Sequence, residues 1–256
     1  MTEAPPPGRL FLVPMPLGPE ADPKAVLPAA TIEAAAALEH FVAENARTAR
    51  RFLARLPLAV PIQQVRFEEL NEHTRPDALP GLLAPLFAGS DLGLVSEAGC
   101  PAIANPGAAL VALAHERGIV VVPLVGPSAI LLALMASGLN GQAFAFHGYL
   151  PVESTARTMR IRELETASAA SGATQAFIET PYRAEAMFAA LLATADPTTR
   201  LSVAIDLTLP AASVATHTVG EWRRRPSPAL ASRPAVFALL AQARVSARAG
   251  RQSRRA

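Results

Sequence analysis

Short apolar runs alternate with segments of helical character through the first half of the chain. The apolar runs predict strands at residues 10–13, 41–43, 60–67, 92–95 and 119–122. Helices are expected between them at residues 31–38 (with Thr31 as N-cap), 45–56, 78–87, 106–115 and 128–137. Strands that are apolar on both faces need cover on both faces. The pattern therefore predicts βαβ units and a mainly parallel sheet.

The second half of the chain shows a different pattern after a flexible break at residues 137–141. Strands are expected at 143–147, 175–179, 201–205, 213–218 and 235–240, and helices at 155–166 and 183–192. The last strands follow one another with little helix between them, which favours a sheet of mixed direction. We expect two α/β domains, residues 9–141 and 142–243, with a disordered N-terminus at 1–8 and a disordered basic tail at 244–256.

Composition and charge narrow the class of protein. Hydrophobic residues make up 51% of the 256 residues and charged residues 17%, which is enough apolar material for a substantial core. The single cysteine excludes a disulfide framework and a Cys-rich zinc module. The net charge is +2, but five arginines lie in residues 244–256, and without them 18 basic residues face 21 acidic ones. The folded part therefore presents no overall basic field for nucleic acid.

One long uncharged segment, residues 118–152, raises the question of a membrane span. Pro123, Gly126 and Pro127 interrupt its apolar part, so a strand, a turn and a short helix are the better interpretation. Residues 1–9 are polar and Pro-rich and do not resemble a signal peptide. We expect a cytoplasmic protein that does not enter a membrane.

Several common catalytic and cofactor motifs are absent from the sequence. The 15 glycines include no G-x-G pair, and neither a Walker motif nor a G-x-S-x-G elbow occurs. The five histidines lie far apart and without metal-ligand spacing, so no metal site is expected. Readings as a nucleotide hydrolase, a dinucleotide oxidoreductase or a serine hydrolase therefore lose their support.

Four loops at predicted strand ends are rich in Gly, Pro and small polar residues. They cover residues 14–18, 96–107, 126–129 and 179–183. Each one alone is explained by ordinary turn chemistry and a helix cap. Ligands of α/β sheets, however, bind beyond the carboxyl ends of strands, and twelve residues at 96–107 are long for a mere connection.

Taken together, these loops resemble the tetrapyrrole methylase superfamily, the class III S-adenosylmethionine-dependent methyltransferases. The nearest resemblance is to the family that 2′-O-methylates a cytidine ribose of 16S ribosomal RNA. That family shows A-T-P-I-G-N, A-E-D-T-R, S-D-A-G-T-P-G-I-S-D-P-G, G-P-S-A and E-S-P-H-R in this order. This chain has P-M-P-L-G-P at 14–19, A-E-N-A-R at 43–47, S-E-A-G-C-P-A-I-A-N-P-G at 96–107, G-P-S-A at 126–129 and E-T-P-Y-R at 179–183. Order and spacing agree over about residues 9–240.

The resemblance implies a bilobal fold of two α/β domains, S-adenosylmethionine in the cleft between the lobes, and a homodimer. The segment from Ser96 to Gly99, with Ile103, would line the methionine and ribose, and Glu179 with Thr180 would approach the adenine. The positions that match the family's cofactor loops are Pro16, Gly18, Ser96, Glu97, Ala98, Gly99, Ile103, Gly126, Ser128, Ala129, Glu179 and Thr180.

The chain departs from the ribosomal RNA family mainly on the substrate side. Asn45 and Ala46 replace Asp and Thr, Glu97 and Asn105 each replace an Asp, and residues 209–213 lack a Lys-containing acidic stretch. The cofactor loops are better preserved, so the departures indicate a divergent subgroup with its own acceptor.

The catalytic candidates are Glu44, Arg47 and Arg183. A ribose hydroxyl benefits from a nearby base or charge, which Glu44 and Arg47 could supply, and Arg183 could hold a phosphate or carboxylate. An i, i+3 ion pair at a helix start explains Glu44 and Arg47 equally well. Cys100 is expected to be a packed loop residue, because no partner base is visible.

The leading hypothesis is a methyltransferase acting on ribosomal RNA. A methyltransferase for a tetrapyrrole or another small molecule is an alternative that suits the negative body of the chain. A third possibility is a cofactor-binding regulatory protein without catalysis, which the neutral side chains of Asn45, Ala211 and Ala212 suggest.

Overall fold

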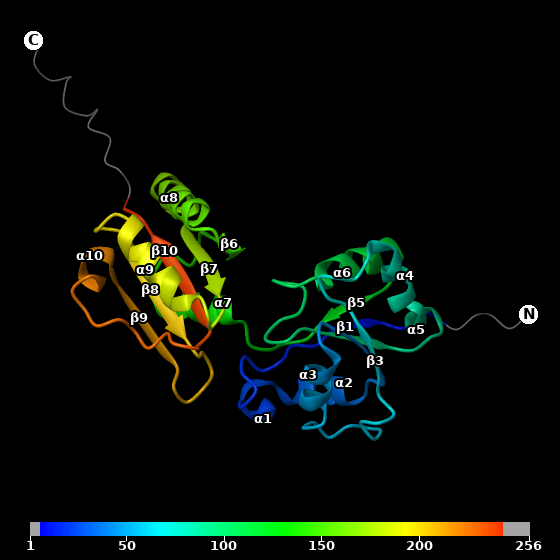
Figure 1. The fold of residues 1–256 in the computed structure, drawn as a ribbon. Coiled ribbons are helices and arrows are strands. Elements are labelled where there is room, and N and C mark those ends of the chain that lie inside the picture. Colours follow the sequence, from blue (N-terminus) through cyan, green and yellow to red (C-terminus); the bar gives the residue numbers. More distant parts are fainter. Residues whose placement is uncertain (1–5, 243–256) are drawn as a thin grey trace, which may run out of the picture. The chain divides into compact units, whose positions relative to one another are not determined.

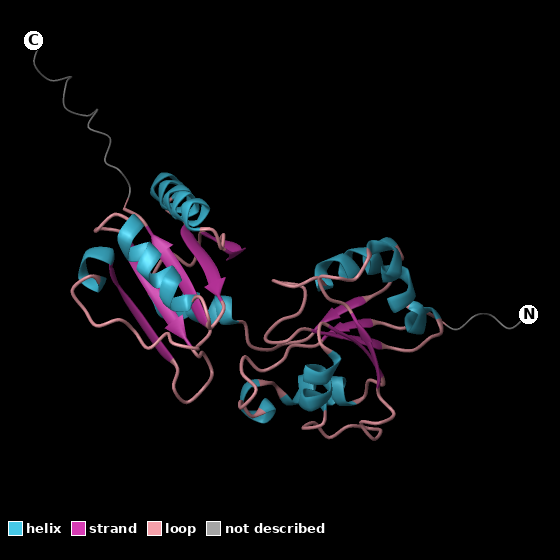
Figure 2. Cartoon of the chain, in the orientation of Figure 1, coloured by secondary structure: helices cyan, strands magenta, loops and turns pink. Residues whose placement is uncertain are grey.

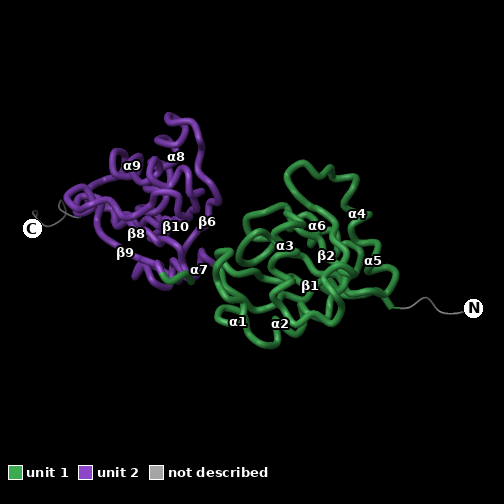
Figure 3. The backbone as a smooth tube through the Cα atoms, turned by 60° about the horizontal axis from the view of Figure 1, so that its bottom comes forward, with its two compact units in different colours: residues 1–128, 208–210 green, residues 129–207, 211–256 purple. Residues whose placement is uncertain are grey.

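The computed structural model describes residues 6–242 and divides into two compact units, each with its own sheet (Figure 3). The first unit takes residues up to Ser128 with Thr208–Pro210, and the second takes Ala129–Leu207 with the residues from Ala211 onward. The predicted division at residues 141 and 142 would have put helix α7 (Ala129–Ser137) in the first domain. This helix packs on the strands of the second sheet instead. The basic tail expected at 244–256 lies outside the described residues.

The first unit contains a five-stranded sheet in which every pairing is parallel, as the apolar runs predicted. The strand order is β3-β2-β4-β1-β5. The strands are β1 (Leu10–Leu12), β2 (His40–Ala43), β3 (Arg66–Glu69), β4 (Leu92–Val95) and β5 (Val121–Pro123). The register aligns Leu10 with Leu92 on one side and with Val121 on the other.

Helices cover both faces of this sheet (Figures 1 and 2). One core joins strand residues such as Phe11 and Phe41 to α2 (Ala29–Ala36) and α3 (Ala46–Leu53). The opposite core joins Leu10 and Leu92 to the helices on the other face. Those helices are α4 (Leu79–Leu82), α5 (Ala84–Phe87) and α6 (Gly107–Glu116). A short helix α1 (Pro23–Val26) precedes α2 and was not expected.

Three local expectations for the first unit were wrong. The strand expected at 60–67 begins only at Arg66, and its exposed edge position explains why β3 is not apolar. The helix expected at 78–87 is broken into α4, α5 and a 3-10 turn at Pro76–Ala78, since each of the three pieces has a proline in its first turn. Thr31 is not an N-cap: it lies inside α2, and its hydroxyl donates to the carbonyl of Val125 at 2.7 Å.

Gly8 falls in the segment expected to be disordered, but it is buried and its amide donates to the Leu86 carbonyl at 2.8 Å.

The second unit has a sheet of mixed direction, which the closely spaced strands predicted. Its order is β6-β7-β10-β8-β9, and β10 runs antiparallel to both of its neighbours. The strands are β6 (Phe144–Tyr149), β7 (Thr174–Glu179), β8 (Arg200–Ile205), β9 (Ser213–Thr218) and β10 (Ala235–Leu240). Helix α7 packs on one face, beside Ala204 and Val236.

The main core of the second unit lies on the other face of this sheet. It contains side chains of α8 (Ser154–Ser171), α9 (Ala184–Thr194) and the short helix α10 (Val219–Trp222). Phe177 stacks on Phe237 at its centre, with ring centroids 5.7 Å apart.

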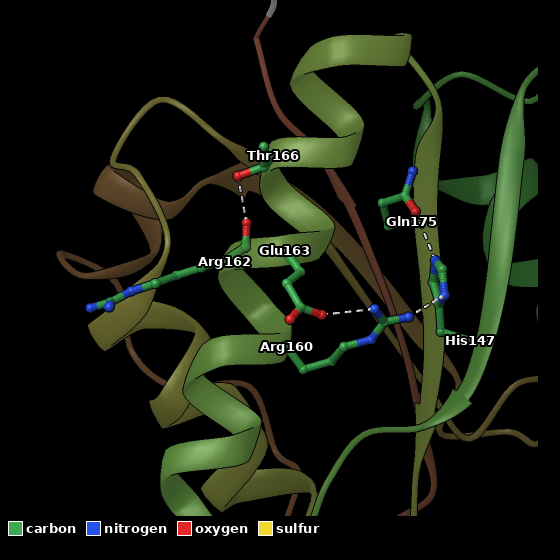
Figure 4. A network of polar contacts seen from close by, with 6 residues as sticks. All are labelled: His147, Arg160, Arg162, Glu163, Thr166 and Gln175. Atoms are coloured by element: carbon green, nitrogen blue, oxygen red, sulfur yellow. Dashed lines mark hydrogen bonds and ion pairs between the residues drawn. The ribbon is translucent and has the colours of Figure 1, made fainter.

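A polar network ties the edge strand β6 to α8 and β7 (Figure 4). The Arg160 guanidinium donates to Nδ1 of His147 at 3.1 Å and also pairs with Glu163 at 3.0 Å. Because Arg160 can only donate, Nδ1 is the acceptor, and the proton on Nε2 of His147 is donated to Gln175 at 2.7 Å. His147 therefore has a structural role in this network.

No helix in residues 6–242 is long and apolar enough to cross a membrane. The uncharged segment at 118–152 contains β5, a turn, α7 and β6, as the interrupting prolines and glycine indicated.

Candidate functional site

The order of the first sheet creates a switch point between β1 and β4. From β1 the chain goes through α2, on one face, to β2, whereas from β4 it goes through α6, on the other face, to β5. Two neighbouring parallel strands whose connections leave in opposite directions open a crevice at their carboxyl ends, where α/β proteins bind ligands. The loops at this point are residues 13–22 and 96–106. They overlap two of the four loops singled out from the sequence, residues 14–18 and 96–107.

These two loops are joined by an isolated antiparallel bridge between Met15 and Gly99. The Met15 amide donates to the Gly99 carbonyl at 2.9 Å, and the Gly99 amide donates back at 3.0 Å. Gly99 is buried and has a φ of +67°, and a Cβ there would lie 3.1 Å from Leu17 and 3.4 Å from the Pro127 carbonyl. Glycine is thus required both for the backbone angle and for the close approach of three loops.

The conformation of the loop after β4 is fixed by hydrogen bonds of its own polar side chains. The buried Ser96 hydroxyl donates to the Ala98 carbonyl at 3.1 Å. The Asn105 side-chain oxygen accepts from the amides of Ala102 and Gly107, both at 3.0 Å. Ala102 has a φ of +64°, which an L-residue rarely adopts, so this arrangement carries backbone strain. Asn105 performs this task as an Asp would, because both side chains offer the same acceptor oxygen.

The loop after β5 closes the same edge of the sheet. A Cβ on Gly126 would collide with the ring of Pro14, so the two loops pack backbone against ring. The Cys100 thiol donates to the Pro127 carbonyl at 3.5 Å, and burial raises the pKa of that thiol above its ordinary value. Cys100 is therefore a packed loop residue, in agreement with its expected role. Ser128 ends the first unit, and Ala129 begins α7 in the second.

The predicted cofactor residues of the first unit fall into two groups, one buried and one exposed. Pro16, Ser96 and Gly99 are buried and shape the loops. Glu97, Ala98 and Ile103 are exposed, and Ile103 keeps 56% of its surface although it is a large apolar residue. An exposed carboxylate and an exposed apolar side chain at a switch point are groups that a bound ligand could cover.

Glu44 follows β2 at the same edge. Its amide donates to the Val95 carbonyl at 3.3 Å, which places it beside the end of β4. Burial raises the pKa of the Glu44 carboxyl, and the charges of Glu97 and Glu72 raise it further, against a hydrogen bond from the Glu97 backbone that lowers it. Glu44 is therefore a stronger base than an ordinary carboxylate, as a proton acceptor near neutral pH should be.

Asn45 and Arg47 begin α3. The Asn45 side-chain oxygen caps this helix, accepting from the amides of Arg47 at 3.0 Å and Thr48 at 3.2 Å. Asn and Asp are equally good N-caps, so the replacement of the family's Asp leaves the local fold intact. Arg47 is exposed, and among the described residues it forms no ion pair with Glu44, in contrast to the i, i+3 pair weighed from the sequence.

The fourth motif lies at the end of β7 in the second unit. The Glu179 carboxylate is fully buried, pairs with the Arg183 guanidinium at 2.6 Å and accepts from the Thr180 amide at 2.8 Å. Arg183 also donates to the Leu150 carbonyl at 2.9 Å. Its guanidinium is therefore engaged within the second unit and positions Glu179.

Sequence reasoning did not predict the structural roles of two residues in these loops. Met15 forms the bridge to Gly99, and Asn105 fixes the turn before α6. Asn105 carries a readable signal, because an Asn before Pro-Gly at a helix start is typical of a side-chain-stabilised turn. No group of three or more side chains suited to a metal ion occurs in the described part of the chain.

Sequence comparisons give the chain a set of relatives. No family model matches the sequence. It is 38% identical over 174 residues to the ribosomal RNA small subunit methyltransferase I of Mesorhizobium japonicum, covering 68% of this chain and 55% of the relative. It is 35% identical over 158 residues to the protein of the same name from Escherichia coli O157:H7, covering 62% and 52%. The chain thus spans about half the length of the curated relatives it matches.

Solved structures share the fold over nearly the whole chain. The methyltransferase CobJ matches with a TM-score of 0.59 and 18% identity, covering 91% of this chain and 94% of that one. The uroporphyrin-III C-methyltransferase of Thermus thermophilus, solved with S-adenosylhomocysteine, matches with a TM-score of 0.53 and 16% identity, covering 91% and 97%. The expected fold class is confirmed by these likenesses. The chain is a homologue of the ribosomal RNA small subunit methyltransferase I proteins and has the fold of the tetrapyrrole methylase superfamily.

Proposed function

We propose that the protein is an S-adenosylmethionine-dependent methyltransferase whose acceptor is a ribose 2′-hydroxyl of ribosomal RNA. The observation that carries the proposal is the bridge between Met15 and Gly99 at the switch point of a parallel sheet. The identity of 38% over 174 residues to a ribosomal RNA methyltransferase supports the choice of acceptor.

The residues at the carboxyl edge of the first sheet fit the chemistry of this cofactor. When bound, S-adenosylmethionine would supply a methyl group activated on a sulfonium. Gly99 and Gly126 let the loops at this edge pack closely against one another, which fixes the shape of the crevice that would receive the cofactor. Glu97 offers a carboxylate for an ammonium or a ribose hydroxyl, and Ile103 offers an exposed apolar surface for a ring or an alkyl chain.

The remaining cofactor positions keep the roles that the resemblance implies. Pro16 and Gly18 shape the first loop, and Ser128 and Ala129 contribute backbone groups at the start of α7. In the second unit, Thr180 and the buried Glu179 form the adenine-side element, and Arg183 holds the Glu179 carboxylate in place.

Glu44 takes the proton that leaves the acceptor hydroxyl, because its raised pKa makes it a stronger base than an ordinary carboxylate. Arg47, exposed two residues after the N-cap of α3, holds a phosphate next to the reacting ribose. Alignment of the acceptor with the activated methyl group supplies the larger part of the rate enhancement, about 7–11 kcal/mol for well-oriented reactants.

The proposal includes a homodimer and a cytoplasmic place of action, where ribosomal RNA is modified. Apolar side chains exposed on the second unit support a protein interface there, with Met135 of α7 at 79% exposure and Phe144 of β6 at 41%. Sedimentation velocity at micromolar protein should show a species of twice the chain mass.

The test is methyl transfer from tritiated S-adenosylmethionine to unmethylated small ribosomal subunits, with uroporphyrinogen as the competing acceptor. The proposal predicts label in the RNA and, after alkaline hydrolysis, in a dinucleotide that resists cleavage because its 2′-oxygen is blocked. Label in the tetrapyrrole and none in the RNA would contradict the acceptor. Cofactor binding without transfer to either substrate would instead favour the regulatory alternative.

A further inference from the structure

Helix α3 has an apolar face and an arginine face. Ala49, Phe52 and Leu53 are buried against the sheet, whereas Arg47, Arg50 and Arg51 are exposed. Residues 46–57 contain no acid. Because Asn45 caps the helix directly after Glu44, the arginine face begins at the edge of the sheet where the proposed reaction takes place.

These three arginines are not neutralised by ion pairs within the described residues. Other arginines are: Arg9 pairs with Asp91, Arg160 with Glu163, and Arg233 with Asp206. The nearby carboxylate of Glu69 instead accepts a hydrogen bond from the Ala46 amide at 3.1 Å. The arginine face is thus a local cationic surface on a chain whose body has more acidic than basic residues.

Packing holds part of this face in a defined position. The Arg50 guanidinium lies over the Phe67 ring, 4.7 Å from its centroid, on the edge strand β3. A guanidinium held over an aromatic ring can still direct N–H groups away from the ring, which suits hydrogen bonds to phosphate. Arg55, just beyond the helix, donates to the Pro19 carbonyl at 3.0 Å and so ties the end of α3 to the loop after β1.

We propose that Arg50 and Arg51, continuing the surface that Arg47 begins, bind the phosphate backbone of the acceptor RNA beside the methylated nucleotide. The inference rests on the proposed function and names a part of its substrate-binding surface. Charge complementarity selects the occupant, since unpaired arginines on one helix face match a regular array of phosphates. Interaction of Arg50 and Arg51 with the carboxyl end of the helix dipole is a purely structural alternative, and it predicts an effect on stability alone.

The test compares the double variant Arg50→Gln/Arg51→Gln with the control Arg117→Gln/Arg224→Gln. The control removes two exposed arginines that lie outside α3 and its edge of the sheet. Binding of a 16S ribosomal RNA fragment is measured by fluorescence anisotropy between 50 and 300 mM salt. S-adenosylmethionine affinity and the thermal midpoint are measured alongside.

For the α3 variant, RNA affinity at 100 mM salt should fall about tenfold or more, and the slope of log K against log salt should become shallower by about 1.5. Cofactor affinity should not change, and the control should match the wild type. The variant Arg50→Lys/Arg51→Lys should regain most of the slope because it keeps both charges.

Three results would overturn the inference. An α3 variant with the RNA affinity and salt slope of the wild type would contradict it while leaving the proposed function intact. A loss of affinity for poly-aspartate in the α3 variant, with RNA affinity unchanged, would assign the face to an acidic protein partner. A wild-type protein that neither binds nor methylates RNA would remove the proposed function itself, and the inference with it.

Discussion

The charged side chains near the strand ends differ between the two units in whether they form ion pairs. At the carboxyl edge of the first sheet, Glu44 is half-buried beside other carboxylates, and Arg47 is exposed without an ion pair among the described residues. In the second unit, by contrast, Glu179 is paired with Arg183, and Asp206 with Arg233. A charged side chain that lacks an ion-pair partner and lowers the stability of the fold indicates a site for a ligand or a reaction. A charged side chain within an ion pair indicates a structural role.

Sheet direction explains part of this difference. In an all-parallel sheet every carboxyl end lies at one edge, so the loops after β1, β2, β4 and β5 converge there. In the second sheet β10 runs opposite to β7 and β8, which sends its end to the other edge. The first unit can therefore gather more loops around one point than the second can.

The largest expected effect is on catalysis by the first unit. The variant Glu44→Gln should lower the methyl-transfer rate by about 10²–10⁴-fold, because it removes the proton acceptor and retains the shape of the side chain. Cofactor affinity should stay close to that of the wild type. Single-turnover kinetics measures this directly, and a rate within threefold of wild type would remove Glu44 from the mechanism.

The pH dependence of the methyl-transfer rate tests the same role of Glu44 a second time. Since the pKa of Glu44 is raised, the wild-type rate should fall as the pH drops through a value above the ordinary 4.5 of a glutamate. The residual rate of Glu44→Gln should lack this limb.

The next effect is on stability of the second unit. The variant Arg183→Met leaves the Glu179 carboxylate buried without its partner and should cost about 3–5 kcal/mol of unfolding free energy. The matched variant Arg75→Met breaks an exposed pair with Asp77 and should change stability by about 0–1 kcal/mol. Urea denaturation distinguishes them, and equal losses would show that the Glu179 pair is not a buried support.

A pair of reciprocal glycine changes tests the loops at the switch point. Gly99→Ala should destabilise by about 1–2 kcal/mol, because it adds a side chain at a positive φ and close to Leu17. Ala102→Gly relieves the strain at the second positive φ of the loop and should be neutral or stabilising by up to about 1 kcal/mol. Thermal denaturation of both variants should give shifts of opposite sign or clearly different size.

The smallest effects concern the pH dependence of stability. The folded-state pKa of Glu44 is raised, so its ionisation costs stability as the pH rises through that pKa, and Glu44→Gln should be the more stable protein at neutral pH. Burial alone would raise the pKa of Asp91, but the hydrogen bonds and charge of Arg9 outweigh it and lower that pKa.

Asp91 therefore stabilises the fold above its unfolded pKa, and this contribution is lost as the pH falls through the folded one. Asp91→Asn should lose up to about 1 kcal/mol at neutral pH and match the wild type in acid. Denaturation curves at pH 7 and pH 3 measure the stability change of Glu44→Gln and of Asp91→Asn. The same pH dependence for both variants would contradict the difference between a carboxylate at the proposed site and a carboxylate in a structural ion pair.

Much of the fold could be predicted because short stretches of sequence carry the pattern that determines each strand or helix. The strands β1, β2 and β4 are mostly buried in the interior of a parallel sheet, so their residues are almost all apolar and easy to recognise. Strand β5 is an edge strand and only partly buried, but its residues Val121 and Val122 still mark it as a strand. Strand β3 has the sequence R-F-E-E on an exposed edge, and no apolar pattern marks it. The breaks between α4 and α5 follow from prolines that were visible in the sequence but were read as part of one helix.

The candidate site could be predicted only in part. The Gly- and Pro-rich motifs indicated which loops matter, because backbone shape requires those residue types. The environment of Glu44 depends on Glu97, 53 positions further along the chain, and on Glu72, so its raised pKa is a property of the folded molecule. The pairing of Arg183 with Glu179 depends on the turn between the end of β7 and the start of α9, so helical spacing does not predict it.

The central claim is that the cofactor binds where the Met15 and Gly99 loops meet. Calorimetric titration with S-adenosylmethionine and S-adenosylhomocysteine tests it with two variants, Gly99→Arg and Gly118→Arg. Both glycines have nearly the same positive φ, +67° and +68°, but a Cβ at Gly118 meets nothing within 4 Å. The account predicts micromolar binding to the wild type and to Gly118→Arg, and none to Gly99→Arg. Undiminished binding to a folded Gly99→Arg protein, or no binding to the wild type, would contradict it.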